Sequence, residues 1–251
     1  MTGQYPRDPD RHILHMPLKK KRSVIDDAYY HKKRGPLYRL YTVALRGLAL
    51  VLLPIWAKWD CRYRIVGRKN LKKVRGQGAV LILNHVHFLD VPIACGCAIR
   101  TRKVRYVTLG ENMDIPVAGS LLRALGGIPL GGTVSGVKEF RRIVTHLLER
   151  RKLVLFCAES ALWPYYQGIR PFHRGGFVCA VRAGVPVVPM VITFDQTDRK
   201  RPRLIMTIGE PIPSDGKSAR SLCDETHRFF EDTARQFYGE QENLEDETDA
   251  V

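Results

Sequence analysis

Short apolar runs without polar alternation are the feature that most restricts the fold of this 251-residue chain. A strand with one face in water alternates apolar and polar residues, whereas a strand covered on both faces is apolar throughout. The runs are "RYRIVG" (62–67), "GAVLILN" (78–84), "VRYVTLG" (104–110), "LVLFCA" (153–158), "VPVVPMVITF" (185–194) and "RLIMTIG" (203–209). Several of them are continuously apolar, so we expect a sheet that is covered on both faces.

Stretches with helical character lie between and after these runs. They are "VPIACGCAIR" (91–100), "VAGSLLRALG" (117–126), "GVKEFRRIVTHLLERR" (136–151) and "SARSLCDETHRFFEDTARQFYG" (218–239). Alternating strands and helices are typical of a parallel sheet, because parallel neighbours need a crossover connection. We therefore predict an α/β fold with a mixed, mostly parallel sheet flanked by helices. An apolar content of 45% is sufficient for the core of such a domain.

Basic charge is concentrated in the N-terminal third. Residues 1–75 hold 19 Lys or Arg against 5 Asp or Glu, within a formal net charge of +16. We interpret residues 1–35, which contain "KKKR" and "HKKR", as a basic flexible arm. Residues 240–251 hold six acids and no base, and we expect them to be a disordered acidic tail. The basic field suits a polyanion, such as nucleic acid, an anionic bilayer or a phosphate-bearing substrate.

Residues 36–59 form the most apolar stretch of the chain. A bilayer span needs about 20 clean apolar residues. Here the apolar part, from Tyr41 to Trp56, is interrupted by Arg46 and Pro54. We predict a helix that lies in the membrane interface, because tyrosines, tryptophans and bases flank it. The alternative is that this helix is buried in the main domain. We place the main domain at residues 60–239.

Polar side chains follow directly after the buried run of residues 78–84, in "LILNHVHFLD". Ligands of open α/β sheets bind beyond the carboxyl ends of the strands, which is where His85 falls. Asp90 precedes "VPIACG" and has the position of a helix N-cap, with Pro92 in the first turn. Across such a turn Asp90 could accept a hydrogen bond from His85 and leave the other ring nitrogen free to take a proton. The alternative is that Asp90 only caps the helix and His85 only ends the strand.

A metal site is a weaker interpretation of the same residues. His-Val-His after a strand is similar to the first ligands of metal hydrolases, but further ligands are required. Only His146, His173 and His227 follow in the chain, and none is in a convincing context. The six cysteines lack the paired spacing of a zinc site and are interpreted as reduced core thiols of a cytosolic protein. We expect no metal and no secretion signal.

Four blocks in the chain carry a family resemblance. "NHVHFLD" resembles the His-x4-Asp block of the glycerolipid acyltransferases of the lysophosphatidic acid acyltransferase type. "GGIPL" (126–130), "CAES" around Glu159 and "VPVVP" (185–189) follow in the order and spacing of the other three blocks of that family. The similarity covers about residues 60–215. It implies a glycerol-3-phosphate acyltransferase-like fold and an acyltransferase domain over 60–239.

The resemblance also implies a reaction. His85 is expected to be the general base that deprotonates the acceptor hydroxyl, and Asp90 to orient it. The donor is an acyl thioester on coenzyme A or acyl carrier protein, and no other cofactor is required. The acceptor is the sn-2 hydroxyl of 1-acyl-sn-glycerol 3-phosphate (lysophosphatidic acid), which gives phosphatidic acid. The acceptor site is expected to include Asn84, His87, Glu159 and Ser160. For His87 the alternative is that it only fills space, and for Glu159 it is a strand-end carboxylate paired with a nearby base.

Two expected phosphate ligands are missing from the pattern. The arginine that usually ends the second block falls on Gly132, and the arginine of the third block falls on Leu162. Arg170, His173 and Arg174 could replace this charge, because a guanidinium binds phosphate through two parallel hydrogen bonds. The alternative is that they form a solvated basic loop.

These departures leave two other functions open. One is acyl transfer to another lysophospholipid or lipid hydroxyl. The other is a non-catalytic, basic lipid- or nucleic-acid-binding protein. We predict the enzyme, acting at the cytoplasmic face of the cell membrane as a peripheral or monotopic protein, with anionic lipids and not nucleic acid as its partner.

Overall fold

The computed structural model describes residues 5–11, 25, 30, 35–101, 103–195 and 202–249. This part of the chain forms a seven-stranded sheet in the order β1-β7-β6-β2-β5-β3-β4. In chain order the strands are β1 (Arg64–Val66), β2 (Ala79–Leu83), β3 (Val104–Thr108), β4 (Gly127–Pro129), β5 (Leu153–Cys157), β6 (Val187–Asp195) and β7 (Arg203–Ile208). Among these strands only β6 and β7 pair antiparallel. The predicted mixed, mostly parallel sheet is confirmed.

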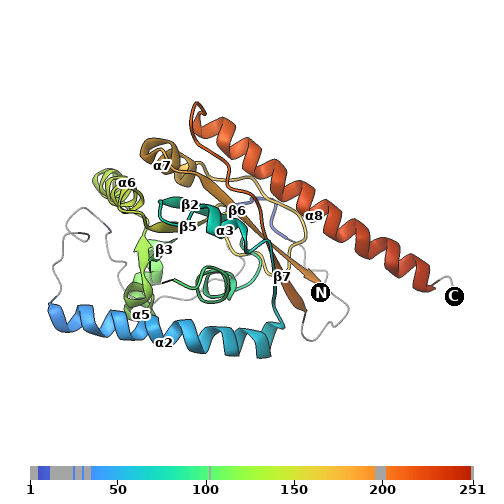
Figure 1. Ribbon diagram of the computed structural model, residues 1–251, viewed down its shortest axis with the longest axis horizontal. Coiled ribbons are helices and arrows are strands. Elements are labelled where there is room, and N and C mark those ends of the chain that lie inside the picture. The colour runs from blue at the N-terminus through green and yellow to red at the C-terminus, as the bar shows by residue number, and fades with distance from the viewer. Residues whose placement is uncertain are drawn as a thin grey trace.

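Helices cover both faces of the sheet (Figure 1). One face carries α6 (Val134–Glu149), α7 (Gly175–Ala183) and α8 (Ala219–Asp249). The other carries α2 (Pro36–Cys61), α5 (Ala118–Leu125) and the one-turn α4 (Asp90–Pro92), which continues as the π-helix η1 (Ile93–Ile99). Shorter connections are α3 (Asn70–Lys73) and the 3-10 helix η2 (Gly110–Asp114). Burial on both faces explains why the strands are apolar without alternation; all five residues of β2 are buried.

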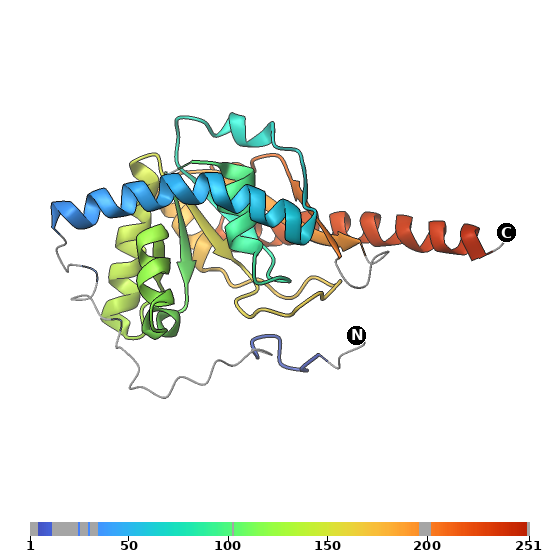
Figure 2. The same ribbon diagram turned by 90° about the horizontal axis from the view of Figure 1, so that it is seen from below.

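Helix α2 has one face on the domain and one face in solvent (Figure 2). It packs against η1 and α5, with Ala57 only 2% exposed. By length and composition it could cross a membrane, and little of its apolar part is buried inside the domain. Its exposed apolar side chains are Leu37, Leu40, Tyr41, Val43, Leu48, Val51, Leu52, Ile55, Trp56 and Trp59. The alternative prediction of a wholly buried core helix is therefore wrong, because one face of α2 is apolar and exposed.

The two ends of the chain differ from the sequence prediction. Part of the predicted flexible arm packs on the domain: Ile25 is 2% exposed, and the Tyr30 hydroxyl donates to the carbonyl of Pro129 at 2.6 Å. The clusters "KKKR" and "HKKR" lie outside the described residues. At the other end α8 continues to Asp249, so residues 240–249 are helical and not a disordered tail. Acidic residues spaced along that stretch are compatible with a solvated helix, which composition alone did not indicate.

Candidate active site

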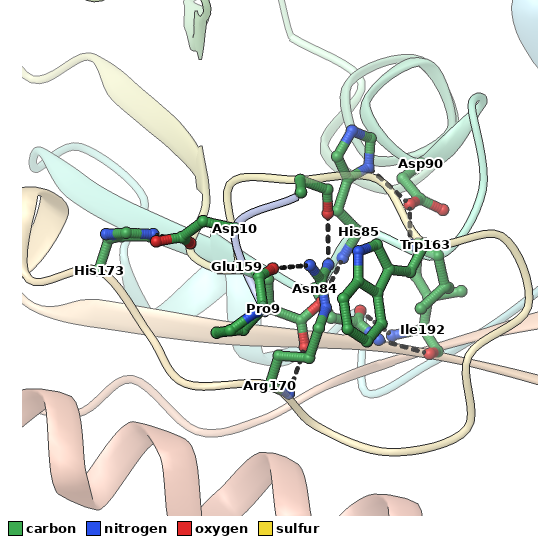
Figure 3. A network of polar contacts seen from close by, with 12 residues as sticks. Pro9, Asp10, Asn84, His85, Asp90, Glu159, Trp163, Arg170, His173 and Ile192 are labelled. Atoms are coloured by element: carbon green, nitrogen blue, oxygen red, sulfur yellow. Dashed lines mark hydrogen bonds and ion pairs between the residues drawn. The ribbon is translucent and has the colours of Figure 1, made fainter. Parts of the chain in front are cut away.

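His85 and Asp90 lie together at the carboxyl end of β2. The chain turns between β2 and α4, and this turn brings Nδ1 of His85 to 3.1 Å from Oδ2 of Asp90 (Figure 3). The His85 side chain is 21% exposed and that of Asp90 is fully buried. The other ring nitrogen, Nε2, has no hydrogen-bond partner among the described residues, and His85 lines a cavity. The pair has the arrangement that general-base chemistry requires, in which a carboxylate holds one ring nitrogen and the other faces a substrate.

Asp90 holds the turn as well as the imidazole. Its Oδ2 also accepts from the backbone N–H of Val86 at 2.7 Å and of His87 at 2.8 Å. The residue before the helix is Leu89, so Asp90 is the first helical residue and not the predicted N-cap. The carboxylate caps the preceding turn, and this fixes the direction of the His85 ring.

A buried ion pair supports His85 from the neighbouring strand β5. Oε2 of Glu159, just after β5, accepts from the backbone N–H of His85 at 3.1 Å and from Nη2 of Arg170 at 2.9 Å. Oε1 of Glu159 accepts from the backbone N–H of Arg170, also at 2.9 Å. The side chains of Glu159 and Arg170 are 0% and 3% exposed. Glu159 is thus the strand-end carboxylate with a nearby base, the alternative that the sequence left open.

Asn84 joins two strands and does not face a substrate. Its Nδ2 donates to the carbonyl of Ile192 in β6, and its Oδ1 accepts from the Ile192 N–H, each at 2.8 Å. The residue is 1% exposed and is not part of the cavity wall. Its assignment to the acceptor site is therefore wrong. The amide fixes the end of β2 against β6 and so fixes where the turn that carries His85 begins.

A cavity of about 910 Å³ extends from His85 beneath helix α2. It follows β3 from Val104 to Thr108, a length of roughly 13 Å at about 3.3 Å per residue. Its wall beneath α2 is largely apolar: Ala49, Leu50, Leu53, Val91, Pro92, Cys95, Gly96, Val104, Leu122 and Leu125. Most of its polar side chains lie toward the carboxyl ends of the strands: His85, Thr108, Glu111, Asn112, Ser160, His173 and Arg174. Arg46 of α2, Thr101 and Tyr106 line the cavity elsewhere. The cavity can hold an apolar chain with its reactive end beside His85.

The described residues include no group of three or more His, Cys, Asp or Glu side chains that could hold a metal ion. Cys95, Cys97, Cys157, Cys179 and Cys223 are free thiols. Burial raises the pKa of Cys95 to about 12 and that of Cys179 to about 11. These thiols are therefore protonated near neutral pH and behave as core residues.

Comparison with known proteins identifies the family. A profile of the acyltransferase family matches residues 62–193, which contain the His85–Asp90 pair and the Glu159 loop. The chain belongs to the acyltransferase family. An uncharacterized acyltransferase of Schizosaccharomyces pombe is 27% identical over 203 residues, which cover 73% of this chain and 66% of the fission yeast protein. The 1-acyl-sn-glycerophosphate (LPA) acyltransferase PlsC from Thermotoga maritima has the same fold, with a TM-score of 0.60 at 16% identity, covering 84% of this chain and 87% of PlsC.

Arg170 and Arg174, which the sequence analysis assigned together to the acceptor phosphate, have different surroundings in the acyltransferase. Arg170 is buried in an ion pair with Glu159, and its guanidinium carbon lies 4.5 Å from the centre of the Trp163 ring. Because the side chain is enclosed in this way, its assignment as a phosphate ligand is wrong. Arg174 is exposed, lines the cavity and directly precedes α7. Ser160 lines the same wall.

His87 fills space in the acyltransferase and does not face the cavity. It is 7% exposed, packs against Phe88 and Tyr165, and its Nδ1 accepts from the Leu89 N–H at 3.2 Å. Burial lowers the pKa of His87, because the charged form loses hydration there. Of the two alternatives for this residue, the structure therefore favours packing.

Sequence reasoning missed one support of the site. The backbone N–H of Trp163 donates to the carbonyl of His85 at 3.0 Å. The only available signal was the position of this tryptophan within the third block, because a backbone contact across 78 residues leaves no local pattern.

Proposed function

We propose that this acyltransferase transfers a fatty acyl group from an acyl thioester, on coenzyme A or acyl carrier protein, to the sn-2 hydroxyl of 1-acyl-sn-glycerol 3-phosphate. The observation that carries the proposal is the His85–Asp90 pair at the polar end of a long, mainly apolar cavity. The fold shared with PlsC, an LPA acyltransferase, supports the choice of acceptor.

The chemistry follows from the free ring nitrogen of His85. Nε2 accepts the proton of the acceptor hydroxyl while its oxygen attacks the thioester carbonyl. The tetrahedral intermediate then collapses, the C–S bond breaks, and the proton on His85 passes to the leaving thiolate. The buried carboxylate of Asp90 stabilises the imidazolium that forms between these steps. This sequence needs neither an acyl-enzyme nor a metal ion.

The partner of the acceptor phosphate in this proposal is Arg174, which lines the same cavity as His85. Arg174 lines the cavity, and so do Gly175 and Gly176, the first residues of α7. The N-terminus of a helix presents free N–H groups and a partial positive charge to an anion. A guanidinium at the same position adds two parallel donors. Arg174 and the N-terminus of α7 would together replace the positive charge of the two usual arginines, whose positions are Gly132 and Leu162 in this chain.

Membrane association completes the proposal. The exposed apolar face of α2 suits the bilayer interface at the cytoplasmic face of the membrane, and the N-terminal basic residues suit anionic lipids. Because α2 also forms a wall of the cavity, a lipid acceptor would reach His85 without crossing bulk water.

A second candidate is an acceptor without a terminal phosphate, such as another lysophospholipid or a lipid hydroxyl. The observation that favours it is that Arg170 is bound to Glu159 and so does not face the cavity. Among the described residues, Arg174 is then the one arginine at the polar end of the cavity.

Acyl transfer from labelled long-chain acyl-coenzyme A to a panel of acceptors tests both candidates. The panel holds 1-acylglycerol 3-phosphate, glycerol 3-phosphate and neutral lysophospholipids, and His85→Ala is measured alongside. Labelled phosphatidic acid that disappears in the variant supports the first candidate. Label only on an acceptor without the terminal phosphate supports the second. No transfer from coenzyme A or from acyl carrier protein would favour the non-catalytic binding protein.

A further inference from the structure

Arg170 is a buried cation that the proposed reaction does not use. Its Nη2 donates to Glu159 and to the carbonyl of Ala161, and its Nη1 donates to the carbonyl of Pro9 at 2.9 Å. Its guanidinium lies over the ring of Trp163. A side chain that is 3% exposed and bound on several sides is too enclosed to meet a substrate, so its role has to be sought in what it holds.

We propose that Arg170 is a positioning residue that fixes His85 through Glu159, and that residues 5–11 complete the shell around Arg170. This inference rests on the proposed function for its kinetic consequence, although the contacts that carry it are independent of the substrate. Figure 3 shows the chain of contacts from Pro9 through Arg170 and Glu159 to His85.

Both backbone groups of His85 are held by the loop that Arg170 closes. The N–H of His85 donates to Glu159, and its carbonyl accepts from the N–H of Trp163. Arg170 binds the Glu159 carboxylate and stacks on the Trp163 ring, so it holds both of these partners. Without the guanidinium, Glu159 would be a buried carboxylate with no counter-charge, which is strongly unfavourable. It would protonate or turn away, and the anchor of the His85 backbone would be lost.

The N-terminal segment closes the other side of the loop (Figure 2). Nε1 of Trp163 donates to the carbonyl of Arg11, and the Tyr5 hydroxyl donates to the carbonyl of Pro164, each at 2.9 Å. The Tyr5 ring stacks on Trp163 at 5.5 Å between centroids. These contacts hold residues 5–11 over Arg170 and exclude water from its ion pair, which strengthens the interaction.

The double substitution Glu159→Met/Arg170→Met tests the proposal. Replacing a buried ion pair by apolar side chains of similar volume is often neutral for stability, so this variant avoids the unpaired charge of either single substitution. Because a catalytic group displaced by about 1 Å can cost about 100-fold in rate, we expect kcat to fall about 100-fold with KM nearly unchanged. The matched control is Arg228→Gln, which removes an exposed arginine on α8 and should leave kcat as it is.

Hydrogen exchange at the His85 amide gives a second readout that does not depend on activity. We expect faster exchange in the peptide around His85, with α6 and β6 unchanged. Wild-type kcat together with wild-type exchange in the double variant would overturn the inference. An inactive wild-type protein would instead count against the proposed function, and the exchange result would still decide the inference.

Deletion of residues 1–11 keeps the test open if the double variant fails to fold. This change leaves the ion pair in place but exposes it, so we expect faster exchange at His85 and a smaller loss of kcat. Vesicle sedimentation should be unchanged, because α2 is intact. Unchanged exchange and unchanged kcat in the truncated protein would overturn the part of the proposal in which residues 5–11 complete the shell around Arg170.

Discussion

The two faces of the sheet are built for different tasks. On the side of α6, α7 and α8, large aromatic side chains fill the core, and Phe177 and Phe230 are fully buried. On the side of α2 and η1, the core is shared with a cavity of about 910 Å³, and the outer surface of α2 is apolar and exposed. The cavity reaches the α6 and α7 side only at Phe140, Phe156 and the start of α7, whereas α2 and η1 contribute much of its wall and carry the uncovered surface. The difference indicates that stability is drawn mainly from the first face and substrate binding from the second.

Asp90→Asn is expected to have the largest effect, and it acts at the cavity rather than in the packed core. The amide oxygen can take the place of Oδ2, and the NH₂ group the place of Oδ1, which has no partner among the described residues. The turn should persist while the charge that stabilises the imidazolium is lost, so we expect kcat to fall by about 10²–10⁴-fold. Steady-state kinetics with a thermal unfolding control measures this. A variant with normal kcat would show that Asp90 only caps the turn.

Phe230→Ala should lower the stability of the protein and leave substrate binding unchanged. Truncation of a fully buried phenylalanine leaves a cavity in the packed face and lowers the free energy of unfolding by about 3–5 kcal/mol. At a temperature where the variant is folded, KM for both substrates should stay the same. Chemical denaturation and kinetics on the same sample check this. A changed KM with unchanged stability would mean that the two faces are not separate in function.

Membrane binding should depend on the uncovered surface of α2. Ile55 and Trp59 are 66% and 67% exposed, and replacing both with serine removes apolar area that the bilayer would bury. We expect vesicle binding to weaken by at least about tenfold, measured by sedimentation with anionic vesicles. The control is Val134→Ser, an exposed apolar side chain on α6. Equal losses in both proteins would remove the special role of α2.

Gly96→Ala should produce a smaller change inside the cavity. A Cβ at Gly96 would lie 2.9 Å from Cβ of Leu53, so α2 has to move away from η1. We expect kcat/KM for long-chain thioesters to change by up to about tenfold, with less effect on short chains. The matched control is Gly47→Ala, because an added Cβ there meets no atom within 4 Å. If kcat/KM depended on acyl-chain length in the same way for both variants, the cavity would not be the binding site of the acyl chain.

The pH dependence of stability should show the smallest effect, at His87. Its folded pKa lies below the ordinary value of 6.5, chiefly because the ring is buried. Below pH 6.5 the unfolded chain therefore binds a proton more readily than the folded one, and stability falls as the pH falls toward the folded pKa. His87→Asn keeps an acceptor for the Leu89 N–H but does not titrate. Urea unfolding of both proteins over this range should show a weaker dependence in the variant; identical dependence would assign it to other groups.

Local patterns in the sequence predicted most of the sheet. Strands β2, β5 and β6 follow nearly continuous apolar runs, β3 and β7 follow shorter runs that include Arg or Thr, and the three residues of β4 are too few to give a pattern. His85 and Asp90 could be paired because both lie within one turn. The π-helix η1 could not be distinguished from an ordinary helix, since both have the same apolar composition.

Long-range contacts account for the residues that sequence misplaced. Asn84 binds Ile192, 108 residues away, and Arg170 binds the carbonyl of Pro9, 161 residues away. Neither pairing leaves a periodic signal, so a polar residue beside a catalytic block was interpreted as a ligand. The same reasoning treated the first 35 residues as an arm, although residues 5–11, 25 and 30 lie on the domain.

The position of β2 between β5 and β6 also sets the order of events during synthesis. The turn at His85 needs Glu159 and the Ile192 backbone, so it cannot assemble until about three-quarters of the chain has left the ribosome. Helix α2 ends at Cys61 and is complete about 130 residues earlier, which is on the order of 10 seconds at typical translation rates. During that interval its apolar surface has no domain to pack on. A nascent chain can therefore reach the bilayer before it can fold, and the enzyme would mature at the surface that holds the lipid substrates of the proposed reaction.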